Sequence, residues 1–278
     1  MKKLKKIGPS TVFSYVFLTV LAIVCVFPLL WLLVSAFKSS NEMLANPTAF
    51  LPKDWTWENF KTVLFTLKFT VNIKNSVIVA LWTTVIATFI SCLAVYGIIR
   101  FFPKLGNIMT RILITTYMFP SIMLVIPYAV VMKTLGLTNT RVGLVLVYMS
   151  FSVPYAVWML VGFFKTVPIG IEEAARIDGA NRLMVFTKIV LPLVRPGIVS
   201  TAIYVFINAW NEFLYALLLV SSSDKTTLSV AVKTLEGADI LNWGSMMAAS
   251  AIVVLPSIFF FCLIQNKLAG GLADGAVK

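Results

Sequence analysis

Long apolar stretches constrain the fold of this sequence more than any other feature. About twenty apolar residues are enough to cross the hydrocarbon core of a bilayer as a helix. Six such stretches are expected in this chain, at 12–36, 74–99, 109–132, 142–164, 198–221 and 245–265. The composition, 59% hydrophobic and 12% charged, agrees with this because soluble domains are far more polar. The sequence therefore predicts an all-α, polytopic membrane protein with one transmembrane domain over residues 1–278.

The distribution of lysine and arginine predicts the orientation of the chain. Six spans place both termini on the same side of the membrane. If that side is the cytoplasm, the larger share of the basic residues that flank the spans also lies inside, as the positive-inside rule describes. We therefore expect a protein of the cytoplasmic membrane of a prokaryote, with both termini in the cytoplasm. The net charge of +12 follows from this topology, so no nucleic-acid partner is expected.

One polar segment, residues 168–196, separates the fourth and fifth apolar stretches and would lie in the cytoplasm. Pro168 and the carboxylates that follow it favour the start of a helix. Gly179 favours the end of that helix, and Asn181 can cap a second one. The segment is too short to bury a core of its own. A helix–Gly–helix element of this kind is expected to rest on another protein.

The fifth apolar stretch contains the second chemical signal. Glu212 is the only acidic residue deep within a predicted span, where a charge costs about 3 kcal/mol on insertion scales. One face of the expected helix carries four polar side chains, Asn208, Asn211, Glu212 and Tyr215, and Trp210 adds an aromatic surface. This mixture suits sugar hydroxyls and sugar rings. Two interpretations stay open: the cluster lines a translocation path, or it is a polar contact between helices.

Motifs for binding nucleotides or metals are missing from the sequence. It contains neither a GxxxxGK[ST] loop nor a GxGxxG motif, and it has no histidine. Its three cysteines, Cys25, Cys92 and Cys262, lie within apolar stretches and lack the spacing of a metal site. No nucleophile–base pair stands out. The chain is therefore not expected to be an enzyme or to hold a cofactor or metal.

The polar segment carries a motif that points to a family. Glu173-Ala174-Ala175, Gly179 four residues later, and Ile189-Val190-Leu191-Pro192 resemble the EAA loop of ABC importer permeases. In that family the loop is a coupling helix that fits a cleft on the ATPase subunit. The resemblance implies that the residues that couple this chain to the ATPase are Glu173, Ala174, Ala175, Asp178, Gly179, Ile189, Leu191 and Pro192.

The resemblance covers nearly the whole chain. Trp210-Asn211-Glu212-Phe213 is similar to the fifth-span motif of carbohydrate-type importers. The C-terminal segment 267–278 resembles the cytoplasmic tail of maltose-type permeases, which reaches the ATPase dimer interface. Gly271 and Gly275 would then belong to an extended tail that contacts the ATPases. In maltose-type relatives the other permease makes most sugar contacts, so the cluster around Glu212 either gates the path or binds sugar.

The implied assembly contains several other proteins. The resemblance implies a second homologous permease, two ATPase subunits that hold ATP and Mg²⁺, an extracytoplasmic solute-binding protein and the lipid bilayer. Its substrate would be a carbohydrate, with an oligosaccharide expected. In this interpretation, closure of the ATPase dimer switches the cavity of the membrane domain from an inward-facing to an outward-facing state.

Alternative functions follow from the same residues. One is the permease of an ABC importer for a solute other than sugar. Another is an ion-coupled secondary carrier that uses Glu212 as its proton site. The single intramembrane carboxylate and the lack of a visible inverted repeat argue against the carrier. A membrane-embedded enzyme ranks last.

Overall fold

The structure is a computed structural model that describes residues 9–235 and 242–276, without the side chains of 9, 103–105, 107 and 264–276. Within these ranges every regular element is a helix. The chain forms two compact units, one of residues 1–68 and 234–252, the other of 69–233 and 253–278. Each unit is described by itself.

The first unit begins with a long apolar helix. Its helices are α1 (Pro9–Ser35), α2 (Ser40–Ala45), α3 (Glu58–Lys61), the π-helical turn η1 (Thr62–Thr66) and the first part of α14 (Trp243–Ala276). The side chains of α1 are exposed on all sides from residue 10 to residue 30, as expected of a helix whose solvent is lipid. The connection after α1 is fixed by Asn59, whose amide donates to the carbonyl oxygens of Ala36 (2.9 Å) and Lys38 (2.7 Å).

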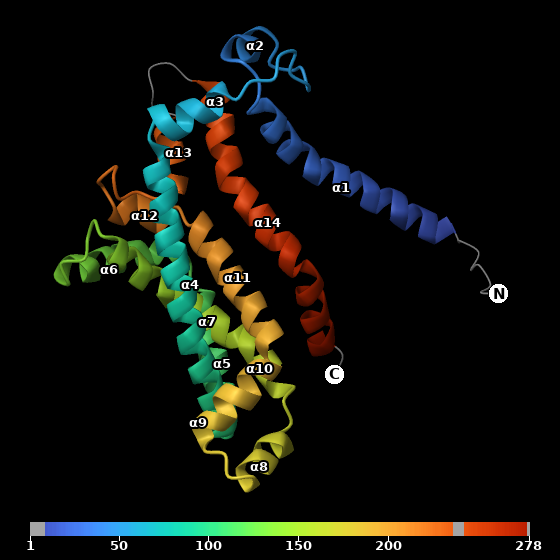
Figure 1. Cartoon of the computed structure of the whole chain (residues 1–278), viewed down its shortest axis with the longest axis vertical. Helices are drawn as coiled ribbons and strands as arrows, with labels where there is room; N and C mark the ends of the chain where they lie inside the picture. Colours follow the sequence, from blue (N-terminus) through green and yellow to red (C-terminus); the bar gives the residue numbers. More distant parts are fainter. Residues whose placement is uncertain (1–8, 236–241, 277–278) are drawn as a thin grey trace. The chain divides into compact units, whose positions relative to one another are not determined.

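The second unit holds the remaining helices. They are α4 (Phe69–Arg100), α5 (Pro103–Tyr117), α6 (Ser121–Thr134), α7 (Arg141–Lys165), α8 (Ile169–Ile177), α9 (Arg182–Val185), the π-helical turn η2 (Phe186–Val190), α10 (Leu191–Leu193), α11 (Arg195–Asn211), α12 (Leu214–Leu219) and α13 (Leu228–Thr234). Figure 1 shows α4, α7 and α11 packed side by side. At the end of this bundle where α4 terminates lie α8 and α9.

In the part of the chain that the structure describes, four helices are long and apolar enough to cross a membrane, or up to six if each bent pair is one span. The four are Ser10–Ser35, Phe69–Arg100, Arg141–Lys165 and Trp243–Leu263. They confirm the predicted first, second, fourth and sixth spans to within a few residues. The third predicted span is bent by 93° between Ile108–Tyr117 and Ser121–Thr134. Pro120 precedes the second half, so the break lies where a proline prevents continuation.

The fifth predicted span is not one continuous helix. Its first part, α11, ends at Asn211, and Glu212 has extended backbone angles (φ −64°, ψ 130°) before α12 begins. The prediction of an unbroken helix over 198–221 is therefore wrong. The residues from Asn208 to Tyr215 do not lie on one helical face. Periodicity alone cannot reveal this break because no proline or glycine marks it.

Tight packing brings the central helices of the second unit together. Phe164 and Leu160 of α7 pack with Val95 of α4 in a buried apolar cluster. Gly197 lies at the start of α11, where an added Cβ would come within 2.2 Å of the ring of Phe163. Any larger residue would push α11 away from α7.

Asparagines hold the loop between α12 and α13 on the bundle. Asn72 donates to the carbonyl oxygens of Ser223 (3.2 Å) and Thr226 (3.1 Å), and Asn75 donates to those of Asp224 and Thr226 (2.9 Å each). These hydrogen bonds supply donors to loop carbonyl groups that lie outside regular helices. The loop is thus a fixed part of the second unit.

The C-terminal segment differs from its predicted conformation. Helix α14 continues to Ala276, so Gly271 and Gly275 lie in helical backbone. The prediction of an extended tail is wrong up to residue 276, while 277–278 lie outside the described residues. A glycine costs a helix only about 1 kcal/mol, which its neighbours can offset. Whether this segment contacts an ATPase stays a prediction.

Candidate functional site

The first candidate site is the helical loop over residues 168–196. Pro168 occupies the N-cap position of α8, and Gly179 follows its end with φ +90°, a conformation that favours glycine. The N–H group of Ala180 closes the helix on the carbonyl of Ala175 (3.0 Å). The Asn181 side chain accepts from the N–H group of Met184 (2.8 Å) and so begins α9. The predicted helix–Gly–helix element is confirmed in its geometry.

A buried ion pair attaches α8 to α4. The guanidinium Nε of Arg100 lies 2.6 Å from Oε1 of Glu172, and their side chains are 10% and 9% exposed. The hydroxyl of Tyr96 donates to the other carboxylate oxygen (3.0 Å), and Nη2 of Arg100 donates to the carbonyl of Val167 (2.8 Å). Both partners therefore have further hydrogen bonds, as a buried pair requires. These contacts fix the start of α8 to the last turn of α4.

Glu172 was not among the predicted site residues. A signal for it was present: Glu172 lies three residues before Ala175, on the same side of α8. Arg100 ends an apolar stretch and needs a partner if it is buried. Sequence alone does not say that these two residues, 72 positions apart, would meet.

The inner face of the loop packs on its own chain. Ala175, Ala180 and Leu191 contact the buried cluster that contains Val95 and Phe164. Ala175 therefore faces the chain's own core and is only partly exposed. Its small size serves packing within this chain.

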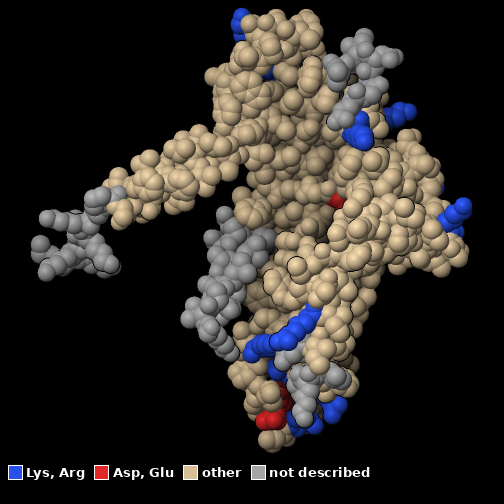
Figure 2. Space-filling model, turned by 180° about the vertical axis from the view of Figure 1, so that it is seen from behind, with Lys and Arg blue, Asp and Glu red and all other residues tan. Residues whose placement is uncertain are grey.

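The outer face of the loop is exposed. Glu173, Ala174, Asp178, Gly179 and Pro192 are exposed, and Ile189 is half-buried. Apolar side chains share this face, with Ile177 at 87% and Leu183 at 70% exposure. Charged side chains gather at this end of the molecule (Figure 2).

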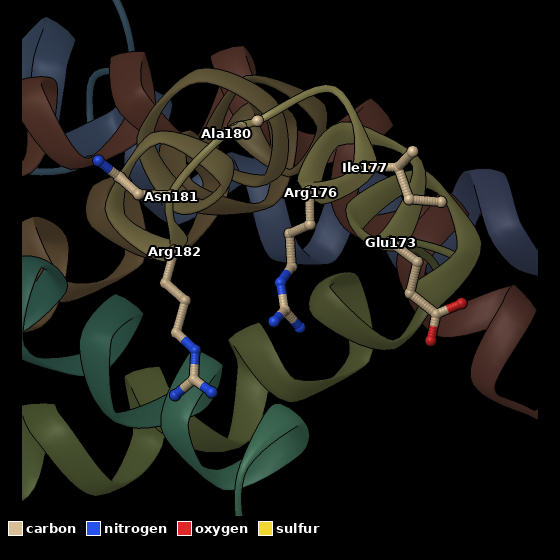
Figure 3. A pocket seen from close by; sticks show the side chains of 7 residues that line it. Glu173, Arg176, Ile177, Ala180, Asn181 and Arg182 are labelled. Carbon is tan, nitrogen blue, oxygen red and sulfur yellow. The ribbon is translucent and has the colours of Figure 1, made fainter.

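A hollow of about 760 Å³ opens between α8 and α9. Figure 3 shows Arg176 and Arg182 extending in the same direction there, with Glu173 on the other side of Arg176. The residues that line the hollow are Glu173, Arg176, Ile177, Gly179, Ala180, Asn181 and Arg182. It offers two cations, a carboxylate and one exposed apolar side chain to a partner.

The second candidate site is a cavity of about 760 Å³ within the second unit. Four regions build it: the bend between α5 and α6, the middle of α7, the end of α11 and the start of α12. Its lining consists of Thr116, Tyr117, Phe119, Ser121, Leu124, Tyr128, Ser150, Phe151, Ile207, Asn208, Asn211, Glu212 and Tyr215. Aromatic rings and uncharged polar groups dominate this lining.

Glu212 is fixed by the backbone of α12. Its Oε1 accepts from the N–H group of Tyr215 (2.8 Å), and its Oε2 accepts from that of Ala216 (3.1 Å). The carboxylate thus satisfies free N–H groups at a helix start, which explains how the helix can break here. The Tyr215 hydroxyl donates to the carbonyl of Ser121 (2.9 Å) and holds α12 against the start of α6.

The cavity brings together four of the five residues predicted to line a path. Asn208, Asn211, Glu212 and Tyr215 line it, because the break turns their side chains toward a common space. Trp210 does not line it: its side chain is 4% exposed, and Nε1 donates to the carbonyl of Val253 (2.9 Å).

Other cavity residues were not predicted. Tyr128 donates to Ser150 (2.6 Å), and the ring of Phe151 stacks on Tyr215 with centroids 5.8 Å apart. These residues come from different helices, so no single-helix periodicity could single them out.

Residues 87–273 match a family model described as "Binding-protein-dependent transport system inner membrane component". The chain belongs to this family, and it is therefore the membrane component of an ABC transport system. The prediction of an ABC importer permease is confirmed.

Curated relatives and a solved structure agree with this assignment. The trehalose/maltose transport system permease protein MalG of Thermococcus litoralis is 36% identical, over 93% of each chain. The diacetylchitobiose uptake system permease protein NgcG of Streptomyces coelicolor is 30% identical, over 95% of this chain and 88% of that protein. A chain of a bacterial ABC transporter involved in the import of the acidic polysaccharide alginate has the same fold, with a TM-score of 0.79 and 21% identity over 95% of this chain and 99% of that one.

Proposed function

We propose that this chain is the permease subunit of an ATP-driven sugar importer, in which the loop over 168–196 passes the motion of an ATPase to the membrane helices. One observation carries the proposal: the loop presents an exposed outer face while a buried ion pair ties its inner side to α4. An element with these two properties can receive a force on one side and deliver it on the other.

The outer face is proposed as the ATPase contact. Glu173 and Asp178 would accept hydrogen bonds from the ATPase, and Ala174 and Gly179 would permit close approach. Ile177 would fill an apolar pocket of the partner. Ala175 and Leu191 would act from the inner side by fixing the loop to the core, and Ile189 and Pro192 would contribute to the outer face.

The cavity is proposed as this subunit's part of the translocation path. Rings of Tyr117, Phe119 and Tyr128 offer stacking surfaces, and the amides of Asn208 and Asn211 suit hydroxyl groups. The sugar class is supported by this chemistry and by the sugars in the names of the relatives. An oligosaccharide is the proposed substrate.

The remaining parts of the assembly are proposed from the family. They are a second permease, two ATPase subunits that hold ATP and Mg²⁺, and an extracytoplasmic binding protein. Both termini would lie in the cytoplasm with the loop, and the helical segment 267–276 around Gly271 and Gly275 would lie near the ATPases. Hydrolysis of ATP belongs to the partners.

The ion-coupled carrier is not favoured by the geometry. Glu212 uses both carboxylate oxygens to hold α12, so taking up a proton would loosen a helix start. No specific observation favours an importer for a solute other than sugar.

The test is reconstitution of the purified complex in liposomes with its binding protein. Sugar uptake is expected to require ATP, and it should be absent when the ATPase subunits are left out. Uptake by this chain without ATPases, driven by a proton gradient, would contradict the proposal.

A further inference from the structure

Among the described residues, the cavity is lined by a single charged side chain. Glu212 is acidic, and no lysine or arginine lines the cavity among the described residues. We infer that this path favours uncharged sugars and disfavours anionic ones, such as uronic, sulfonated or phosphorylated sugars. This inference rests on the proposed function and adds a charge rule to it.

Two cations lie near the cavity residues without lining the cavity. Arg111 of α5 lines a neighbouring hollow of about 450 Å³ that shares only Thr116 and Phe119 with the cavity. Lys233 lies over the ring of Phe213, 5.7 Å from its centroid, and is not among the lining residues. Neither side chain therefore lines the cavity or contacts its interior directly.

The negative charge of Glu212 is held in place. Both of its carboxylate oxygens accept backbone N–H groups, which fixes the side chain at the start of α12. The side chain is half-buried, so it can neither turn away nor be screened as a surface charge is. A second carboxylate brought beside it would be repelled, because like charges interact strongly where water is scarce.

Uncharged sugars meet a different environment. The other polar groups of the lining are amides and hydroxyls, from Asn208, Asn211, Ser150 and Tyr128 among others. These groups donate to and accept from hydroxyls without carrying charge. Discrimination would thus come mainly from repulsion of the wrong solute. The fold does not itself set such a preference, since a transporter involved in the import of the acidic polysaccharide alginate contains a chain with the same fold. The preference would have to come from side chains such as Glu212.

The first experiment measures the electrostatic potential in the cavity, and it requires no sugar. Cys25, Cys92 and Cys262 are replaced, Ser150→Cys is introduced as the only thiol of the chain, and the assembled importer is treated with two methanethiosulfonates of similar size. One reagent carries a trimethylammonium group and the other a sulfonate group. The cationic reagent is expected to react faster at this position by about tenfold, after normalisation to a cysteine at Ser221, which is exposed outside the cavity.

Neutralisation of Glu212 provides the decisive comparison. Glu212→Gln should bring the ratio of the two rates close to that at the outside position. Asp224→Asn removes the same charge from an exposed loop and should leave the ratio unchanged. A wild-type ratio equal to that at the outside position, or one that Glu212→Gln does not alter, would overturn the inference, and a cation supplied by the partner permease would produce that result.

The second experiment measures uptake by the complete importer. A neutral oligosaccharide and its counterpart oxidised to the uronic acid are compared, and the neutral sugar should enter at least about tenfold faster. Equal uptake of both would overturn the charge rule while leaving sugar import intact. If neither sugar enters, the proposed function fails, and the reaction rates at Ser150→Cys still decide the charge of the cavity.

Discussion

Two carboxylates of the second unit, Glu172 and Glu212, have different hydrogen-bonding partners. Glu172 pairs with a cation, Arg100, and also accepts from Tyr96. Glu212 accepts from the backbone N–H groups of Tyr215 and Ala216 and faces a cavity. A charge paired with a cation joins two helices, whereas a charge without a cation can act on a solute that enters the cavity. The comparison separates the proposed coupling element from the proposed translocation path.

The largest effect is expected from breaking the ion pair of Glu172 and Arg100. Glu172→Ala leaves the guanidinium of Arg100 buried without its partner, which costs roughly 3–5 kcal/mol. The start of α8 should detach from α4, so sugar uptake should be lost while the ATPases still hydrolyse ATP. Uptake and ATP hydrolysis are measured on the same proteoliposomes.

The matched control exchanges the two charges. Arg100→Glu combined with Glu172→Arg should restore part of the uptake, because a pair of opposite charges is present again. If Glu172→Ala imports sugar at the normal rate per ATP hydrolysed, the mechanical role of the pair is refuted.

The second prediction separates the two faces of α8. Ala174→Arg adds bulk to the exposed face, so it should abolish coupling without changing the melting temperature of the permease. Ala175→Arg forces a long side chain against the chain's own core and should destabilise the fold by about 1–3 kcal/mol. Thermal unfolding in detergent and ATP-driven uptake distinguish the two outcomes. Equal melting shifts for both variants would contradict the assignment of the faces.

A smaller effect is expected when the carboxylate of Glu212 is removed. Glu212→Ala leaves two N–H groups at the start of α12 without their acceptor, at a cost of about 0.5–2 kcal/mol. Glu212→Gln keeps an oxygen acceptor and should therefore lose less stability than Glu212→Ala. Melting temperatures of the two variants test this order, and a greater loss for the glutamine variant would show that Glu212 does not stabilise the helix start.

The smallest effect concerns Trp210, which lies beside the cavity residues in sequence but not in space. Trp210→Phe removes one hydrogen bond to Val253 and should cost about 1 kcal/mol. Because the side chain does not line the cavity, the relative uptake of neutral and acidic sugars should stay the same. A change in that ratio would place Trp210 on the path.

The loop was largely predictable from the sequence because its signals are local. Gly179 and Asn181 act on their own backbone neighbours, so a few adjacent residues define the ends of the helices. Four of the apolar spans were predictable for the same reason. The role of Glu172 was not predictable from local sequence, because its partner Arg100 is 72 residues away.

The cavity was predictable only in part. Its polar residues stood out within an apolar stretch, but their arrangement depends on a break that the side chain of Glu212 stabilises. Helical periodicity assumed an unbroken helix and therefore included Trp210. The contributions of Tyr128 and Phe151 require the packing of separate helices, which no local pattern encodes.

The most direct test of the central claim is a photo-crosslinking residue placed at Ile177, the exposed apolar side chain at the end of α8. In the assembled importer it should form an adduct with an ATPase subunit, and a matched probe at Trp158 of α7, which is 43% exposed, should not. An Ile177 probe that reacts with lipid or solvent but never with an ATPase would contradict the account.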